Sequence, residues 1–467
     1  MSFPAVHCLY VSMLFNSDYS TTHQLQIVQR CLQEFVGPSP VIEMVSFTNW
    51  AQVVSYDHVF VAKPKSSEEI QRIVRAALSY RRQVRAMGSS HSISPLYGDR
   101  GQIYLNLTDL TLDDGQTVVL KPAGPSDTHA TVRVAAGLSQ GNFDQELDIL
   151  GYHFPYGPVI IEPHIGGALG TGSHAGFYNS ASVGAFLVGA RLVDGWGNIR
   201  VFSEDTHPEV MKAQRCNLGL LGILFEVELK VIPQVSVVHK NVFTPLRNLY
   251  DPNFLRGVVA GNYHVNIWHD PYNSLTEKEA QEVLKTGLVP ETWDCGNDLA
   301  MLELVNPVSS PATIQIKDER PSSYNVTVVS QGQAVFKTRL ALPPTRVVPL
   351  HKAVHGPAWP YNLVITEYDF PDPDFTASAA AIRSLASTLN HESRKDGVQN
   401  LHDNLFRWVR STICHLCATS LPSAWIRVPS GQLAATGDVF GTLNLESRWT
   451  NSNELQRSKD IFTKEYH

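Results

Sequence analysis

The chain of 467 residues lacks the marks of a membrane protein, a secreted protein or a nucleic-acid-binding protein. No apolar run approaches the ~20 residues that span a bilayer, and the N-terminus has neither the basic start nor the apolar stretch of a secretory signal. The net charge is -7 and no dense block of lysine and arginine occurs, which excludes nucleic acid as an expected partner. We therefore expect a soluble, cytoplasmic protein without an integral membrane segment.

Cysteine is also scarce. Six cysteines in a chain of this length do not form a disulfide framework. Residues 414–417 (CHLC) are one CxxC motif, but a structural zinc site normally needs a second pair, and the sequence has none. We expect this motif to be structural or incidental and predict no metal site.

What the sequence does contain is alternating strand and helix patterning from about residue 49 onward. A strand at 59–62 is followed by a capping box at Ser66 and Glu69, a helix, and a second strand at 84–87. Ser139 and Gly151 are placed to start and stop a further helix. The length predicts two or three structural units. We expect an extension over 1–48, a first domain over 49–233, a second over 234–425 and a C-terminal segment over 426–467.

Two glycine-rich turns are the most informative motifs. Residues 84–92 (VRAMGSSHS) end an apolar run in a small-residue turn that carries His91, and residues 166–174 (GGALGTGSH) form the second turn. The second turn has the wrong glycine spacing for a Rossmann fingerprint, and no lysine follows Gly172 as in a P-loop. Free backbone N–H groups in such loops bind anions. Either turn alone could be an ordinary tight turn, but the pair can hold the two ends of an extended phosphate-bearing cofactor.

These two turns, followed by residues 217–224 (NLGLLGIL), resemble the FAD-binding domain of the vanillyl-alcohol oxidase/para-cresol methylhydroxylase superfamily. Within it the chain is most similar to the sugar-1,4-lactone (gulonolactone/arabinonolactone) and alditol oxidases. The resemblance is good over about 49–233 and traceable to about 425. It implies an α+β fold, in which two α+β subdomains bind FAD and an α+β domain forms the substrate-binding cap.

The resemblance also implies a set of cofactor-binding residues. His91 matches the position that carries the flavin covalently in many relatives, through a ring nitrogen and the C8 methyl. No cysteine for a second flavin bond is present around residues 156–158. The positions implied to contact FAD are Gly88, Ser89, Ser90, His91, Ser92, Gly167, Gly170, Thr171, Ser173, His174, Gly222 and Ile223.

The second domain departs from the family pattern. Relatives have a Glu-x-Arg pair on a strand over the flavin, and here Arg407 is retained while Leu405 stands in the acid's place. The family's His-Trp-x-Lys-like motif is reduced to residues 448–451 (RWTN). Because leucine cannot accept a proton, another base is needed. The alternating strand at 263–269 offers His264, on one face with Asn266 and Trp268, as a candidate, while residues 367–371 are treated as scaffold.

Two functions from different classes remain open, besides a scaffold without catalysis. The first is an FAD-dependent oxidoreductase that takes a hydride from a hydroxyl-bearing small molecule to flavin N5 and is reoxidised by O2 or another acceptor. The second, suggested by the lost acid, is a flavin-containing cyclase or isomerase with no net redox turnover. In the first function Arg407 and His264 are the predicted catalytic residues.

Overall fold

The computed structural model describes residues 22–410, except 95, 98–100, 125–128, 156, 180–181, 311–314, 358–362, 400 and 402, together with residues 439–448. The CxxC motif at 414–417 and residues 449–451 lie outside this part of the chain. Within it, no helix has the length and apolar character that crossing a bilayer requires.

The first sheet has the strand order β1-β2-β4-β3 and is covered by two helices. β1 and β2 are antiparallel, while β4 is parallel to both β2 and β3. The predicted helix starts as expected, because the Ser66 hydroxyl accepts from the Glu69 N–H at 3.4 Å. Ile70, Ile73 and Val74 on that helix are buried against the sheet. The elements are α2 (Thr22–Val36), β1 (Ile42–Thr48), β2 (Ser55–Ala62), α3 (Ser67–Ser79), β3 (Val84–Met87) and β4 (Ile103–Asn106).

The second sheet has the order β5-β6-β10-β8-β9, with β7 paired to the end of β10. Its helix α4 starts at Ser139, whose side chain accepts from Asn142 N, and ends at Gly151 in the left-handed conformation with φ 76°. Both ends are those that the sequence predicted. The elements are β5 (Val118–Lys121), β6 (Ala130–Ala135), α4 (Gln140–Leu150), β7 (Tyr152–His153), α5 (Ile165–Gly170), η1 (Val183–Phe186), β8 (Leu187–Val193), β9 (Ile199–Ser203), α6 (Pro208–Gln214) and β10 (Ile223–Pro233).

The third sheet, the cap sheet, has the order β14-β11-β13-β12-β16-β17-β15. All of its described pairings are antiparallel. The elements are β11 (Ser236–Pro245), η2 (Leu246–Tyr250), α7 (Pro252–Ala260), β12 (His264–His269), α8 (Glu277–Thr286), η3 (Cys295–Asn297), β13 (Leu299–Pro307), α9 (Gln331–Leu340), β14 (Thr345–Pro349), α10 (Leu350–Val354), β15 (Leu363–Pro371), α11 (Thr376–Lys395), β16 (Asp403–Arg410) and β17 (Val439–Arg448).

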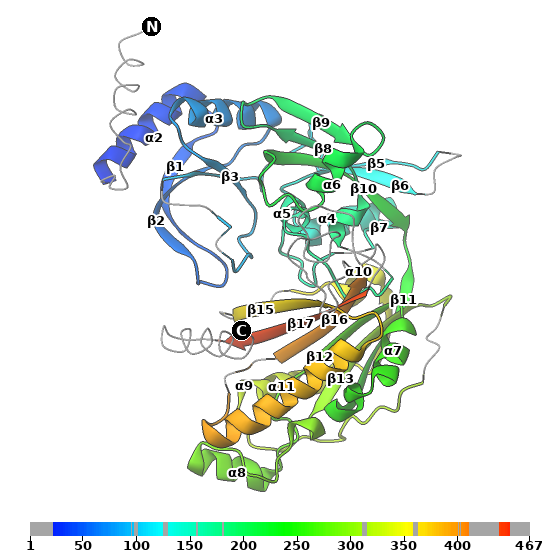
Figure 1. Ribbon diagram of the computed structural model, residues 1–467. Helices are drawn as coiled ribbons and strands as arrows, with labels where there is room; N and C mark the ends of the chain where they lie inside the picture. The colour runs from blue at the N-terminus through cyan, green and yellow to red at the C-terminus, as the bar shows by residue number, and fades with distance from the viewer. Residues whose placement is uncertain are drawn as a thin grey trace.

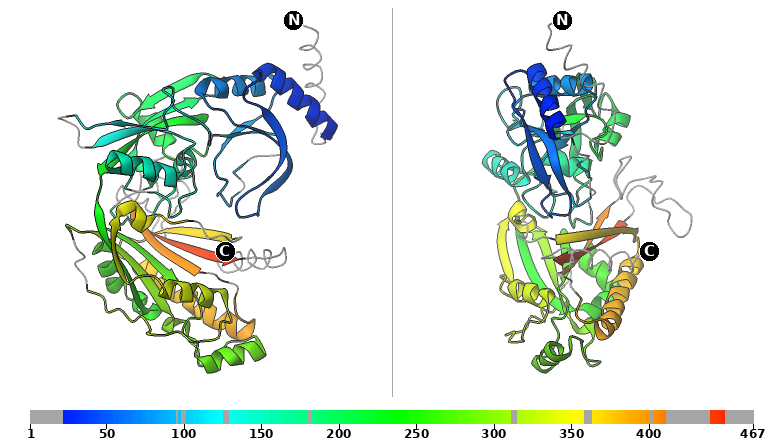
Figure 2. Two further views of the ribbon diagram at one scale, coloured as in Figure 1. Left: turned by 180° about the vertical axis from the view of Figure 1, so that it is seen from behind. Right: turned by 90° about the vertical axis from the view of Figure 1, so that its left-hand side faces the viewer.

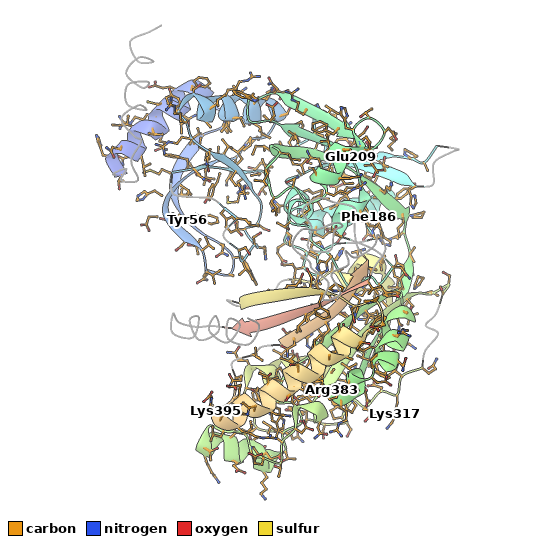
Figure 3. The ribbon with its side chains drawn as sticks, in the orientation of Figure 1. Tyr56, Phe186, Glu209, Lys317, Arg383 and Lys395 are labelled. Carbon is orange, nitrogen blue, oxygen red and sulfur yellow. The ribbon has the colours of Figure 1, made fainter. Side chains whose placement is uncertain are left out.

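The two smaller sheets lie together in the upper part of Figure 1, and the cap sheet forms the lower part. The chain crosses between them once at the right-hand edge of Figure 1, between the end of β10 at Pro233 and the start of β11 at Ser236. The view from behind in Figure 2 shows β15, β16 and β17 on the side of the cap nearest the upper part. Figure 3 places Phe186 in the upper part and Arg383, on α11, at the outer side of the lower part.

One face of the cap sheet is apolar along its length, whereas the other carries polar groups beside a smaller apolar cluster that contains Trp268 and Leu405. Val265 and Ile267 of β12, with Phe406 and Trp408 of β16, point to the core that α11 and α7 cover. Because side chains alternate along a strand, the residues between them point to the opposite face. That face is turned toward the upper part of the molecule and carries the predicted site residues His264 and Arg407.

Two predicted domain limits differ from the structure. Residues 42–48, expected in an N-terminal extension, form β1 and pair with β2, so the first sheet begins before residue 49. Residues 439–448, expected in a separate C-terminal segment, form β17 between β16 and β15. Neither pairing could be predicted from local pattern, because strand order in a sheet depends on contacts that are distant in sequence.

Candidate functional site

The His91 turn is held by the Asn49-Trp50 segment. The Trp50 N–H donates to the Ser90 carbonyl at 2.9 Å, and the Asn49 side-chain amide donates to the Ser92 carbonyl at 3.0 Å. The Trp50 indole stacks on the His91 imidazole, with ring centroids 4.8 Å apart and an interplanar angle of 22°. Ser90 has a positive φ of 60°, which lets the backbone turn sharply at this point. The turn is therefore shaped and fixed by the protein's own contacts.

His91 and the neighbouring His164 are neutral imidazoles. Burial lowers the pKa of His91 and lowers the pKa of His164 to about 4. His164 packs so closely on Gly88 that a Cβ there would lie 2.9 Å from its Cγ, which explains the glycine. Nδ1 of His91 is buried and has no hydrogen-bond partner among the described residues. Leaving a buried nitrogen without a partner is costly.

A cavity of about 430 Å³ opens beside this turn. Gly88, Ser89 and Ser90 line one side of it, and Trp50 and Asn106 are among its other lining residues. A cavity of this size holds part of a dinucleotide. Gly88, Ser89 and Ser90 thus line an open space, whereas the other two predicted residues of this motif, His91 and Ser92, are not among its lining residues.

The second glycine motif differs from its prediction as a loop. Residues 165–170 form the short helix α5. The Thr171 hydroxyl donates to the Gly167 carbonyl at 3.0 Å, and the Ser173 N–H donates to the Ala168 carbonyl at 2.9 Å. Helix-terminal carbonyls need partners, and these groups supply them. Gly167 itself borders open space, because a Cβ at this position would have no neighbouring atom within 4 Å.

The third motif packs on the second. The Leu218 N–H donates to the Gly170 carbonyl at 2.9 Å. Gly222 has a φ of 135°. It lies so close to β8 that a Cβ at this position would be 2.4 Å from the Val193 carbonyl oxygen. Ile223, the next residue, begins β10. The structure therefore brings the three motifs together, as the resemblance implied.

The cap sheet contacts this region through the segment that follows His174. The Val265 N–H donates to the Gly176 carbonyl at 2.8 Å, and a Cβ at Gly176 would lie 2.0 Å from the Val265 carbonyl oxygen. Glycine is therefore needed for the cap strand β12 to approach the FAD-binding part.

Arg407 lies at the centre of the contact between the two parts. Its Nη1 donates to the His174 carbonyl at 3.1 Å, and its Nη2 donates to Glu367 Oε2 at 2.6 Å. Glu367 Oε1 in turn lies 2.8 Å from Nε2 of His174. Arg407 is buried, with 6% of its surface exposed. Its guanidinium group is held by Glu367 of β15 and by His174 of the second glycine motif.

Two polar atoms in this region have no hydrogen-bond partner among the described residues. They are Arg407 Nε and Asp369 Oδ1, and both are buried. Burial, reinforced by the negative charge of Glu367, raises the pKa of Asp369 to about 6. The site therefore offers one free donor and one carboxyl group that changes its protonation state near neutral pH.

Glu367 and Asp369 were treated as scaffold from the sequence, and the structure places Glu367 in contact with Arg407 and His174. They alternate on β15, so both point to the polar face of the cap sheet, while Leu405 on β16 is buried in an apolar cluster with Trp268. The spacing of the two acids was visible in the sequence. Their proximity to Arg407 was not, because β17 lies between their strands.

His264 lies on the predicted face of β12 but is fully buried. The Phe177 ring covers it, with centroids 4.4 Å apart, and neither ring nitrogen has a partner among the described residues. Burial lowers its pKa to about 3, so its cationic form is strongly disfavoured.

The neighbouring Asn266 donates to Glu303 Oε2 at 2.8 Å, and His239 forms an ion pair with Oε1 at 3.1 Å. Burial raises the pKa of Glu303, but these partners outweigh it and lower the pKa to about 2. The polar face thus holds a further carboxyl group, whose pKa lies below its usual range.

Comparisons with known proteins agree with this geometry. Residues 59–203 match the family model described as FAD binding domain. The chain is 29% identical over 237 residues to the D-arabinono-1,4-lactone oxidase of Eremothecium gossypii, covering 51% of this chain and 43% of that protein. It is 26% identical over 215 residues to the L-gulonolactone oxidase of Bos taurus, covering 44% and 45%. The chain thus matches less than half the length of these curated relatives.

Comparison with solved structures shows a similarity of fold over most of the chain. The cholesterol oxidase from B. sterolicum superposes with a TM-score of 0.65 over 90% of this chain and 83% of that one, at 14% identity. The resemblance predicted from the three motifs is confirmed: the chain carries an FAD-binding domain related to that of the lactone oxidases, and FAD is its cofactor. The mixed helix-and-sheet fold class is confirmed as well.

Proposed function

We propose that this protein is an FAD-linked oxidoreductase that oxidises a hydroxyl-bearing small molecule of the lactone or alditol type. FAD, when bound, supplies the hydride acceptor at flavin N5 and passes the electrons to O2 or another acceptor. The observation that carries the proposal is the pair of buried, unsatisfied atoms on the cap face, Arg407 Nε and Asp369 Oδ1. A hydroxyl group, which both accepts and donates, would satisfy both.

In this proposal Arg407 binds the substrate oxygen. Its two terminal nitrogens are engaged by Glu367 and by the His174 carbonyl, so the remaining Nε–H has a fixed direction. A cation held in this way stabilises negative charge that develops on the oxygen as its proton leaves. Glu367 acts through Arg407 and is a positioning residue.

Asp369 is the proposed proton acceptor, in place of the family acid that Leu405 replaces. An efficient general base has a pKa close to the working pH, and the pKa of Asp369 is raised to about 6 by burial and by Glu367. His264 is the weaker candidate, because burial lowers its pKa to about 3 and Phe177 covers its ring.

The cofactor-binding role of the three motifs remains a proposal residue by residue. Gly88, Ser89, Ser90 and Ser92 surround the cavity or its turn, Gly167 borders open space, and Gly170, Ser173, Gly222 and Ile223 form the adjoining backbone. We further propose that Nδ1 of His91, buried without a partner among the described residues, forms the covalent flavin bond. Flavin that stays with the acid-precipitated protein supports this bond, and flavin released entirely into the supernatant refutes it.

Anaerobic mixing with candidate substrates tests the function. Polyols, aldonolactones and aromatic alcohols are screened, and a substrate should bleach the oxidised-flavin absorption, with peroxide release on admitting air if O2 is the acceptor. Turnover without bleaching would establish the redox-neutral cyclase or isomerase instead, which no observation on the described residues favours. The cytoplasmic location expected from the sequence also remains a proposal, and cell fractionation tests it.

A further inference from the structure

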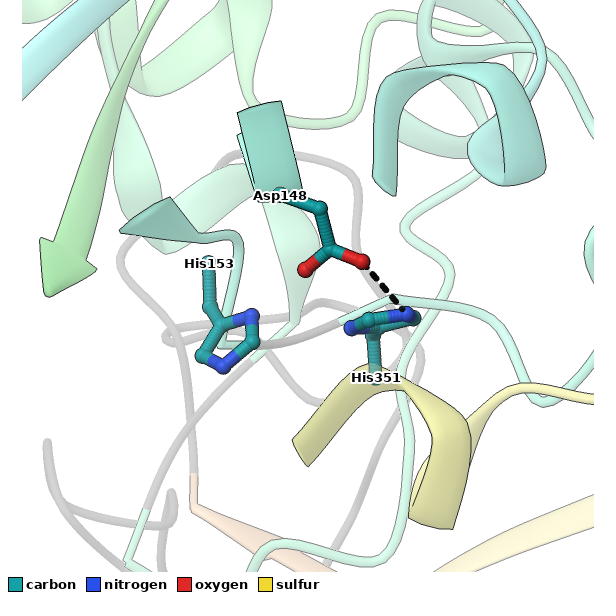
Figure 4. A group of neighbouring side chains, drawn as sticks. All are labelled: Asp148, His153 and His351. Atoms are coloured by element: carbon teal, nitrogen blue, oxygen red, sulfur yellow. Dashed lines mark ion pairs between the residues drawn. The ribbon is translucent and has the colours of Figure 1, made fainter. Parts of the chain in front are cut away.

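A compact group of metal-binding side chains lies where the chain passes from the FAD-binding part to the cap, away from the site described above. Asp148 is in the last turn of α4 and His153 ends β7, while His351 is on α10 of the cap. One ligand atom from each of the three lies within 4.8 Å of the others. Figure 4 shows the three side chains converging from the two parts of the molecule.

The spacing within this group suits a transition-metal ion. Asp148 Oδ2 and His351 Nε2 are 3.3 Å apart, and the rings of His153 and His351 have centroids 5.5 Å apart. Two ligands at ~2.0–2.2 Å from a tetrahedral zinc ion are themselves ~3.3–3.5 Å apart. Two imidazoles and one carboxylate are a common ligand set of three, which leaves a fourth position for water.

A second layer of hydrogen bonds orients two of the ligands. Asp148 Oδ1 accepts from the Gln234 side chain at 3.0 Å, which leaves Oδ2 to bind a metal. His153 Nε2 lies 3.2 Å from the Val235 carbonyl. Because a carbonyl only accepts, Nε2 carries the proton and Nδ1 keeps its lone pair. Metal-binding histidines are characteristically held in this way by a carbonyl or carboxylate.

His351 is largely buried, since its side chain is 10% exposed, and Nε2 is the nitrogen that faces Asp148. The adjacent acid, Asp144, is occupied by His355 at 2.7 Å and supplies a further negative charge nearby.

Two other groups of similar composition are less suitable. His269, Cys295 and Asp298 are fully buried, and Asp298 already accepts hydrogen bonds from the Tyr272 and Ser274 N–H groups. His174, Glu367 and Asp369 share the site of Arg407, whose positive charge lies against Glu367. In the group at the crossing, by contrast, no described lysine or arginine forms an ion pair with Asp148.

We propose that Asp148, His153 and His351 bind one divalent transition-metal ion of the zinc class, with water as the fourth ligand. The ion joins α4 and β7 of the FAD-binding part to α10 of the cap. Its supports, Gln234 and Val235, are the two residues that connect β10 to β11. The site therefore fixes the connection between the two parts and does not take part in the flavin chemistry.

Metal analysis of the full-length flavoprotein tests this proposal. The protein is stripped with a chelator, dialysed against Zn²⁺ at micromolar concentration and then against metal-free buffer, and its zinc content is measured. We expect one zinc per chain in the wild type and a loss of at least tenfold in affinity in His153→Gln and in His351→Gln. His355→Gln is the matched control, because this histidine is also on the α10 side and also pairs with an acid of α4, but it lies outside the group. It should retain the metal.

Two further measurements keep the test decisive if a histidine variant folds poorly. Gln234→Ala removes only an orienting hydrogen bond and should lower zinc affinity about tenfold. Zinc should also raise the unfolding temperature of the wild type by a few degrees, because a ligand that binds only the folded state stabilises it. A wild type that retains no zinc, or variants that retain as much as the wild type, would overturn the proposal whatever the enzyme's activity.

Discussion

The two parts of this molecule build their binding surfaces from different materials. In the FAD-binding part the three motifs supply turns, a short helix and glycines. On the cap face the groups are charged side chains of separate strands, held by one another across the sheet. A binding surface made of backbone requires glycine at a few positions, because a Cβ there would clash. In a binding surface made of side chains, by contrast, a charged residue on one strand can be replaced in a related protein by one on another strand. The proposed use of Asp369 on β15 in place of an acid at position 405 is an instance of the second.

Removing the proposed proton acceptor of the cap, Asp369, is expected to have the largest effect. Asp369→Asn should lower kcat/KM by about 10²–10⁴-fold, because a positioned base contributes on that order. In the wild type kcat/KM should rise as the pH increases through about 6, the pKa to which burial and Glu367 raise Asp369. The variant should lose this dependence, and Asp374→Asn, an exposed position, should retain it.

Asp369→Asn should lower activity but raise the stability of the folded protein near neutral pH. The folded protein holds a proton on Asp369 up to about pH 6, whereas the unfolded chain releases it near 3.8. The stabilisation from this carboxyl group is therefore present below about pH 4 and is lost as the pH rises through 6. Above pH 7, Asp369→Asn should unfold at a higher temperature than the wild type. A variant both inactive and less stable would indicate a structural carboxylate instead.

Arg407 gives the next largest effect. Arg407→Met should lower kcat/KM by about 10²–10³-fold, as expected when one donor to a developing oxyanion is lost. Flavin content is measured alongside, because Arg407 also donates to the His174 carbonyl of the second motif, and kcat/KM is expressed per bound flavin. Lys240→Met, which removes an exposed charge from β11, is the matched control. Equal losses in both variants would point to the net charge of the cap and not to the position of Arg407.

In the FAD-binding part, adding a single methyl group to a closely packed glycine is expected to lower the stability of the fold. Gly222→Ala should lower the free energy of unfolding by about 3 kcal/mol, because the new Cβ meets the Val193 carbonyl at 2.4 Å in a backbone conformation with φ 135°. Chemical denaturation measures this change. Gly195→Ala, in the turn of the β8–β9 hairpin, borders open space and should change stability little. If both glycines tolerate alanine, close approach of the backbone does not explain the motif.

The smallest expected effect separates stability from cofactor binding. Gly167→Ala places a methyl group in open space on helix α5 and should stabilise the protein without flavin by up to about 1 kcal/mol, through helix propensity. If Gly167 approaches FAD as proposed, the same variant should bind less flavin. Unchanged flavin occupancy would remove Gly167 from the proposed contacts.

The sequence predicted those features whose causes are local. The helix between Ser139 and Gly151 was predicted at both ends, because capping residues act within one turn. The helix α5 was missed, because glycine has a low helix propensity and nothing local indicates that Gly166 must pack against Ala136, whose Cβ would lie 2.9 Å from an added methyl group. The position of Glu367 and Asp369 near Arg407 was missed for a related reason. Their distance from Arg407 is set by the insertion of β17, a pairing between segments separated in the sequence.

The place of β17 has a consequence for how the protein is made. The ribosome releases Arg407 and both acids of β15 well before residues 439–448, yet the hydrogen bonds that set their separation run through this strand. During synthesis the FAD-binding part can therefore acquire its sheets and its cofactor while the residues that act on the substrate are not yet aligned. In the proposed function, the groups that bind the substrate are therefore aligned only after β17 has been synthesised and has paired with β15 and β16.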